Sequence, residues 1–173
     1  MTVSSRAASD DVPWLTAEEL HDWFSLSALA ERLPAVLDAQ LQREAGLSMF
    51  EYVVLAHLSE SPDRARRMSQ LAMLANGSLS RLSHGVARLE ARGWVERRPC
   101  ADDGRATEAV LTEAGWEKVV ATAPVHVREV RRLVLDPLTA QQRAALGVAA
   151  RAVLTATDPA AASWLAEGLP GRA

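Results

Sequence analysis

Residues 78–115 read SLSRLSHGVARLEARGWVERRPCADDGRATEAVLTEAG, and the hydrophobic period of this stretch changes at Gly93. Before Gly93, apolar residues recur at the 3-4-3 spacing of a helix with one buried face, and Ser78 is a typical N-cap residue. After Gly93, residues 94–98 and 107–111 read as two strands around a turn-rich segment. The stretch therefore predicts a helix followed by a β-hairpin, and the residues expected to be buried along the helix are Leu79, Leu82, Val86 and Leu89.

Upstream of this helix, local signals predict two more helices. Ser48 and Glu51 form a capping box that begins the first of them. After a turn around Arg64, a short helix is expected over residues 69–75, and the dipeptide Asn76-Gly77 marks the turn that follows it. Two short helices across a glycine-containing turn form a helix-turn-helix, to which the hairpin adds a wing.

Longer helices are predicted on both sides. A capping box of Thr16 and Glu19 begins a Leu- and Trp-rich helix that reaches about residue 43, and Pro34 is expected to kink or split it. A long helix so rich in Leu and Trp usually packs against a partner. The C-terminal expectations are a helix over 113–135 with a bend at Pro124, a helix from the Thr139/Gln142 capping box to about 155, and a weakly specified tail over 156–173.

The fold class expected is mainly α with a small β-hairpin wing. These elements divide the chain into an N-terminal helical region over 1–45, a winged helix-turn-helix over 46–112, and C-terminal helices with the tail over 113–173.

Charge is unevenly distributed along the 173 residues. The net charge is −3, yet residues 64–105 hold nine arginines and four acidic residues, a local charge of +5 that leaves −8 on the rest. One basic segment inside an acidic protein indicates a localised phosphate-binding face, although a solvated surface would give the same asymmetry.

Several classes of protein are disfavoured by the sequence. A single cysteine and four scattered histidines indicate neither an intramolecular disulfide nor a metal site, and we expect no cofactor. No run of 18 uncharged apolar residues and no signal-peptide layout occur, so a cytoplasmic protein is expected. The absence of a nucleophile motif and of a phosphate-cradling glycine loop argues against an enzyme.

The outward face of the helix after Ser78 is short, polar and basic. Such a face suits the DNA major groove, where serines hold phosphates and arginine pairs with guanine; an ordinary solvated face is the alternative. Beyond this helix, Asp102 to Arg105 form a turn that would project Arg105 into a minor groove, with Asp103 holding Arg105 or the neighbouring backbone. The DNA-binding residues predicted are Ser78, Ser80, Arg81, Ser83, His84, Arg88, Arg98, Asp103 and Arg105.

Four segments together resemble the multiple-antibiotic-resistance regulator (MarR) family of winged helix-turn-helix transcriptional regulators. They are Leu71-Ala72, residues 88–95 (RLEARGWV), Asp103-Gly104-Arg105 and residues 111–115 (LTEAG), and the similarity covers roughly 47–155. The resemblance implies an obligate homodimer on a pseudo-palindromic operator, regulated by small phenolic or lipophilic molecules. It implies that residues 1–45 are an N-terminal dimerisation helix region, residues 46–112 a winged helix-turn-helix DNA-binding domain, and residues 113–173 C-terminal dimerisation helices and the tail. It also implies that Ser80, Arg81, His84 and Arg88 are recognition-helix positions, with Asp103 and Arg105 as the wing pair. Gly85 and Ala87 depart from the family pattern and are expected to leave that helix thin.

Three points stay open at this level. An effector cavity could be lined by Trp23, Tyr52 and His57, with Trp14 and Phe24, but aromatics at helical spacing are also typical of a core or dimer interface. Cys100 lies near arginines that could lower its pKa, so a redox role competes with an incidental thiol. A repressor released by an effector competes with a constitutive or architectural DNA-binding protein, and with a module for protein contacts.

Overall fold

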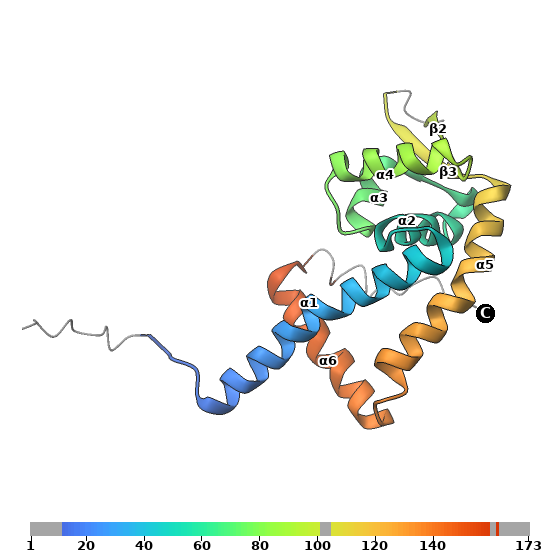
Figure 1. Ribbon diagram of the computed structural model, residues 1–173. Helices are drawn as coiled ribbons and strands as arrows, with labels where there is room; N and C mark the ends of the chain where they lie inside the picture. The colour runs from blue at the N-terminus through green and yellow to red at the C-terminus, as the bar shows by residue number, and fades with distance from the viewer. Residues whose placement is uncertain (1–11, 101–104, 160–161, 163–173) are drawn as a thin grey trace, which may run out of the picture. The chain divides into compact units, whose positions relative to one another are not determined.

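The computed structural model describes residues 12–100, 105–159 and 162. The chain forms two compact units, one up to Ala35 and one from Val36 onward. Helix α1 runs through both, and the winged helix-turn-helix lies in the second unit (Figure 1). The elements are α1 (Ala17–Ala45), α2 (Met49–Ser59), β1 (Ala65–Arg67), α3 (Met68–Leu74), α4 (Leu79–Ala91), β2 (Val95–Pro99), β3 (Thr107–Leu111), α5 (Glu113–Val130) and α6 (Ala140–Thr157), with a 3-10 turn over Pro62–Arg64 and a π-helical turn over Arg131–Leu135.

The core of the second unit is built where α2, α3 and α4 meet the sheet. Leucines from all three helices are fully buried there, and Leu41 joins them from the C-terminal part of α1. Of the four residues predicted to be buried along α4, Leu82, Val86 and Leu89 are buried as expected. Leu79 is 56% exposed, so that expectation is wrong. It lies in the first turn of α4 and faces a groove beside the wing instead of the core.

A three-stranded antiparallel sheet, in the order β1-β3-β2, forms the wing and its base. The predicted hairpin is confirmed, because β2 and β3 pair in the register Val95↔Leu111. Strand β1, which pairs with β3 as Ala65↔Val110, occupies the place where only a turn was predicted. Three residues reading Ala-Arg-Arg are too short and too charged to show strand alternation.

The helix boundaries follow the predicted capping boxes. Ser48 with Glu51 and Thr139 with Gln142 form complete boxes, and the backbone N–H of Thr16 donates to Glu19 at 2.7 Å. These three helix starts are confirmed. Such reciprocal hydrogen bonds satisfy backbone donors that the first turn of a helix leaves without intrahelical partners.

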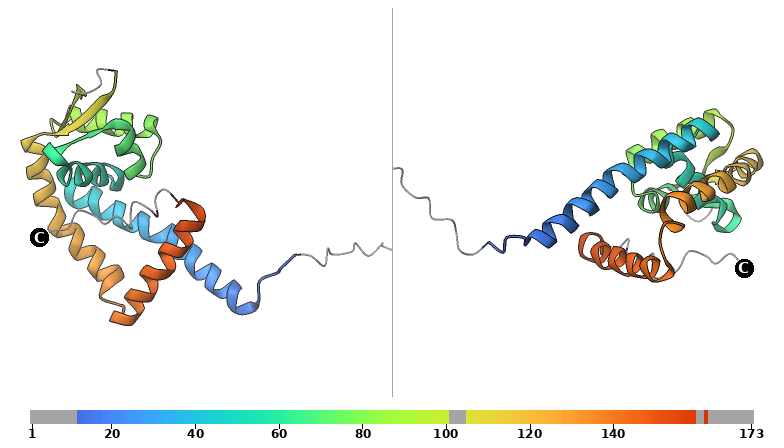
Figure 2. Two further views of the ribbon diagram at one scale, coloured as in Figure 1. Left: turned by 180° about the vertical axis from the view of Figure 1, so that it is seen from behind. Right: turned by 60° about the horizontal axis from the view of Figure 1, so that its bottom comes forward.

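Neither helical proline splits its helix. Pro34 lies inside α1 and Pro124 inside α5, and both helices continue through them. Pro34 therefore does not split α1, whereas a kink at Pro34 and a bend at Pro124 stay predictions. Proline leaves the carbonyl four residues earlier without its donor, and for Pro34 that residue is Ala30, which is exposed to water. None of the described helices is both long enough and apolar enough to cross a membrane. Further views of the ribbon are given in Figure 2.

Candidate nucleic-acid interface

Helix α4 presents most of the predicted DNA-binding residues on its exposed side. Ser78 is the N-cap, and its hydroxyl accepts a hydrogen bond from the backbone N–H of Arg81 at 3.1 Å. Ser78 therefore caps the start of the helix, and its side chain is also exposed. The residues of α4 with exposed side chains include Ser80, Arg81, His84, Ala87 and Arg88, whereas Ser83 is half-buried.

Arg81 is held by an aromatic ring from α2. Its guanidinium carbon lies 4.4 Å from the centre of the Phe50 ring, within the range of a cation–π contact. The same ring packs against Gly77 and Gly85, where an added Cβ would come within 2.8 Å and 2.9 Å of ring atoms. Gly85 is therefore buried beneath Phe50, and the expectation that it thins the exposed face of the helix is wrong.

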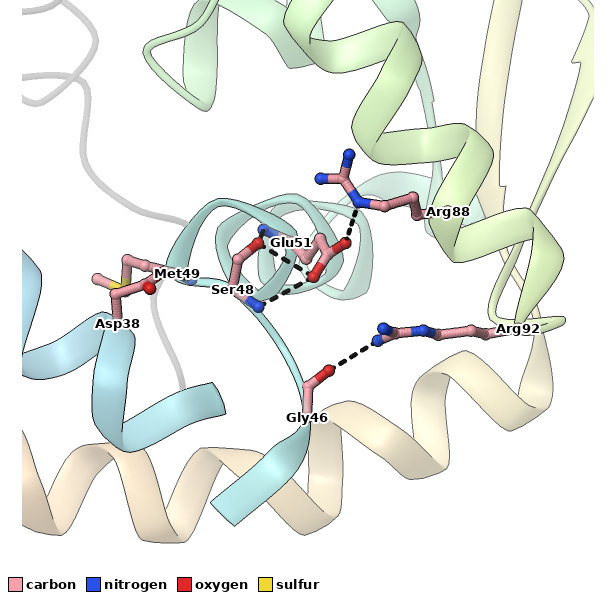
Figure 3. Close-up of polar contacts among 7 residues, drawn as sticks. All are labelled: Asp38, Gly46, Ser48, Met49, Glu51, Arg88 and Arg92. Atoms are coloured by element: carbon pink, nitrogen blue, oxygen red, sulfur yellow. Dashed lines mark hydrogen bonds and ion pairs between the residues drawn. The ribbon is translucent and has the colours of Figure 1, made fainter. Parts of the chain in front are cut away.

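Arg88 is held by the residue that follows Phe50 (Figure 3). Its Nε lies 2.7 Å from Oε1 of Glu51, a carboxylate that is only 4% exposed. The other carboxylate oxygen of Glu51 accepts hydrogen bonds from the backbone N–H and the hydroxyl of Ser48 at 2.9 and 3.0 Å. Burial raises the pKa of Glu51, but the hydrogen bonds from Ser48 and Arg88 outweigh it and leave the pKa below its ordinary value. The charged pair thus ties α4 to α2, and the two terminal nitrogens of Arg88 point away from Glu51 (Figure 3).

Two arginines of strand β2 bind within the protein. Arg98 pairs with Glu108 of β3 at 2.7 Å, and this hydrogen bond raises the pKa of Arg98. Arg97, which the sequence analysis did not single out, donates from Nη2 to the backbone carbonyl of Ser83 at 2.6 Å and lies 3.4 Å from Glu90. Arg97 therefore fastens the wing to α4.

The tip of the wing is only partly described. Arg105 is exposed and lies two residues before β3. Asp103 lies outside the described residues, so its expected pairing with Arg105 stays a prediction.

A basic groove of about 420 Å³ separates the start of α4 from the wing. Three arginines line it, and one of them, Arg67 at the end of β1, was missed by the sequence analysis because β1 itself was missed. The lining residues are Arg67, Met68, Ser69, Leu79, Ser83, Arg97, Arg105, Ala106 and Thr107.

The predicted effector residues lie in different parts of the protein. Tyr52 is buried in the core, and its ring centre lies 4.7 Å from that of His126 on α5, whose pKa is lowered by burial. His57 is half-buried, and burial lowers its pKa despite the opposing effect of Glu60. Trp23 is 55% exposed in the N-terminal unit.

The described part of the chain includes Cys100, for which a redox role competes with an incidental thiol. Cys100 is buried, and its backbone N–H donates to the carbonyl of Ala106 at 2.9 Å. No group of three or more His, Cys, Asp or Glu side chains that could hold a metal ion occurs among the described residues.

Comparison with known proteins connects this geometry to a family. A family model described as MarR family matches residues 45–106. The chain is similar to Sco3205, a MarR family transcriptional regulator from Streptomyces coelicolor solved in complex with DNA, with 46% identity over 87% of this chain and 94% of that one and a TM-score of 0.83. AbsC, a MarR family transcriptional regulator from the same organism, is 37% identical over 93% of this chain and 100% of that one, with a TM-score of 0.75.

A more distant structure shares the fold alone. A mutant of MarR from E. coli complexed with operator DNA is 21% identical over 78% of this chain and 97% of that one, with a TM-score of 0.66. A search of curated proteins found no match. The resemblance seen in the sequence is nevertheless confirmed by relatives that align over nearly their whole length. The chain belongs to the MarR family of transcriptional regulators.

Proposed function

We propose that this protein is a sequence-specific DNA-binding repressor that acts as a homodimer on a pseudo-palindromic operator and is released by a small aromatic or lipophilic effector. The observation that carries the proposal is the exposed polar and basic face of α4 beside a basic groove and a wing. The solved complex of the related Sco3205 with DNA supports it.

Helix α4 is the element proposed to enter the major groove. Ser80 and His84 supply hydrogen-bonding groups, and Ser78 and Ser83 lie at the edges of the same face. The contact with Phe50 already restricts the side chain of Arg81, so binding costs it less conformational entropy. Arg81 is therefore suited to read guanine. Arg88, held through Nε, has its terminal nitrogens left to meet a base or a phosphate.

The wing is proposed to reach the adjacent minor groove. Arg105 supplies the positive charge that a narrow minor groove attracts, and Asp103 is proposed to orient it. Arg98 adds charge at the base of the wing, although its Nε is engaged by Glu108.

Dimerisation is proposed to involve the terminal helices. The N-terminal unit exposes Leu20, Trp23, Phe24, Leu26 and Leu29, and α6 exposes Leu146, Val148 and Val153. Exposed apolar side chains in such numbers are typical of a surface that a partner covers. A second copy would cover them and supply the second winged module of a two-fold symmetric operator, with half-sites about 34 Å apart.

Effector control is proposed to act through the spacing of the two modules. An effector lowers operator affinity by binding more tightly to a state in which the two modules no longer match successive major grooves. Constitutive binding without an effector is the second candidate function. The cavity lined by Gln40, Thr122 and Val125, among others, measures about 70 Å³, below the range of about 300–1,000 Å³ for drug-sized ligands, whereas the groove of about 420 Å³ lies on the face proposed to bind DNA.

One experiment separates these functions. The purified full-length protein is incubated with a randomised duplex library, the retained duplexes are sequenced, and aromatic acids and lipophilic phenols are then tested for release of the enriched duplex. We expect enrichment of an inverted repeat and release by at least one compound. Enrichment without release by any compound would leave the constitutive function, whereas retention with no preferred sequence would contradict specific recognition.

A further inference from the structure

The groove between α4 and the wing is lined by side chains of two chemical kinds. Its three arginines come from three separate places in the fold: Arg67 from the end of β1, Arg97 from β2, and Arg105 from the segment before β3. No carboxylate is found among the described residues that line it. Met68 and Leu79 contribute apolar surface between these arginines. The groove thus combines cationic edges with apolar surface.

A hydrogen bond within the protein joins the two walls of the groove. Arg97 bridges from β2 to the carbonyl of Ser83 on α4, and part of its charge is offset by Glu90. In the sheet register Glu108 of β3 lies between Arg67 of β1 and Arg98 of β2, and it forms a salt bridge with Arg98.

We infer that this groove seats the sugar–phosphate backbone of one DNA strand, and that Arg67 is a phosphate contact. This inference rests on the proposed function. When a helix lies in the major groove and a wing lies in the neighbouring minor groove, one strand of backbone runs between the two elements. That backbone alternates anionic phosphates with apolar deoxyribose faces, which matches arginines interleaved with Met68 and Leu79.

This arrangement gives a physical reason for the exposure of Leu79. The side chain of Leu79 is 56% exposed beside arginines, and exposure of apolar surface to water is unfavourable. A deoxyribose ring would cover this surface. Among the described arginines, Arg67 is the residue to test, because Arg97 fastens the groove and Arg105 belongs to the wing whose contact is already proposed.

The test compares Arg67→Ala with Arg66→Ala in the full-length protein. Arg66 is the matched control: it is the preceding residue of the same strand, it removes the same charge, and its Nε donates to Ser61 at 2.8 Å instead of lining the groove. Binding is measured over a salt series on the duplex enriched from the randomised library, and on versions in which single phosphates are replaced by neutral methylphosphonates. Thermal unfolding of each variant shows that the fold is retained.

We expect Arg67→Ala to weaken binding and to reduce the slope of log K against log salt by about 0.9 for each phosphate contact, or about 1.8 for a dimer. At least one methylphosphonate in each half-site should weaken the wild-type protein and the Arg66→Ala variant, yet have no further effect on Arg67→Ala. Arg67→Lys, which keeps the charge, should recover most of the slope.

Two results would overturn the inference, and they are distinguishable. If the wild-type protein binds the enriched duplex and Arg67→Ala has the affinity, salt slope and methylphosphonate response of Arg66→Ala, the groove does not seat the backbone while the proposed function stands. If the wild-type protein enriches and binds no duplex, the proposed function fails and this inference fails with it.

Discussion

Replacement of Trp23 by Asp is expected to convert the protein from dimer to monomer and to lower its affinity for the operator by about 100-fold or more. Trp23 is 55% exposed on a unit whose exposed surface also includes Phe24 and Leu26. If a second copy covers these side chains, the substitution places a charge in an apolar interface, where it has no compensating partner. A monomer then holds one half-site at a time and loses the gain of linked binding. Sedimentation and operator titration measure the two effects.

The matched control for this change is Ser25→Asp. Ser25 lies on the same helix and is exposed. Its replacement by Asp adds the same charge on a side of the helix about 200° away from Trp23. This variant should remain a dimer and bind the operator within a few-fold of the wild-type protein. A Trp23→Asp variant that stays dimeric, or a monomeric one with unchanged operator affinity, would show that the N-terminal unit does not form the functional interface.

Gly115→Ala is expected to lower the free energy of unfolding by at least about 1–3 kcal/mol. An added Cβ would clash with the carbonyl oxygen of Trp94 and would lie 2.7 Å from Cδ1 of Leu111. The carbonyl of Trp94 cannot easily move, because it also accepts a hydrogen bond from the backbone N–H of Thr112 at 3.1 Å. The clash is therefore with fixed backbone at the junction of the wing and α5.

Gly147→Ala on α6 is the matched control. The nearest atom to its added Cβ is the flexible guanidinium of Arg151, at 3.2 Å, so the substitution should raise helix stability by about 0.5–1 kcal/mol. Denaturant unfolding of both variants gives the two signs directly. Equal midpoints for the two alanine variants would refute the close approach at Gly115.

The same contacts give a physical reason for the Leu-Thr-x-x-Gly segment at residues 111–115. The hydroxyl of Thr112 accepts from the N–H of Gly115 at 3.0 Å and donates to the carbonyl of Gly93 at 2.7 Å. Thr112 therefore caps α5 and ties it to Gly93, just after the end of α4, while Gly115 leaves room for the backbone of Trp94. This short segment, which carries part of the resemblance to the family, thus connects the wing to α5.

Much of the fold could be predicted because its signals are local. Three capping boxes mark helix starts within four residues of sequence, and the change of period at Gly93 marks the passage from helix to hairpin. Strand β1 could not be predicted in this way, since Ala65 to Arg67 become a strand only by pairing with β3, more than 40 residues later. Helix α1 continues through Pro34 for a related reason: solvent around an exposed helix can satisfy the carbonyl that proline leaves without a donor.

The candidate site was predictable in composition but not in its internal contacts. The spacing of Ser48 and Glu51 indicated a cap, yet nothing in that spacing shows that the second oxygen of Glu51 binds Arg88, 37 residues away. Likewise, nothing in the local sequence predicts that the ring of Phe50 packs against Gly85. Phe50 and Glu51 are consecutive residues of α2, and between them they hold two arginines of α4, Arg81 and Arg88.

If α4 reads bases and the wing contacts DNA without regard to sequence, substitutions in the two elements should have different effects. The measurement compares Arg81→Ala and Arg105→Ala on the enriched duplex and on a scrambled duplex over a salt series. Arg81→Ala should cost about 1–3 kcal/mol on the enriched duplex and much less on the scrambled one, because a guanine contact is lost. Arg105→Ala should weaken both duplexes together and reduce the salt slope by about one unit per site. An Arg105→Ala variant with unchanged affinity for both duplexes, or an Arg81→Ala variant that weakens both equally, would contradict this account.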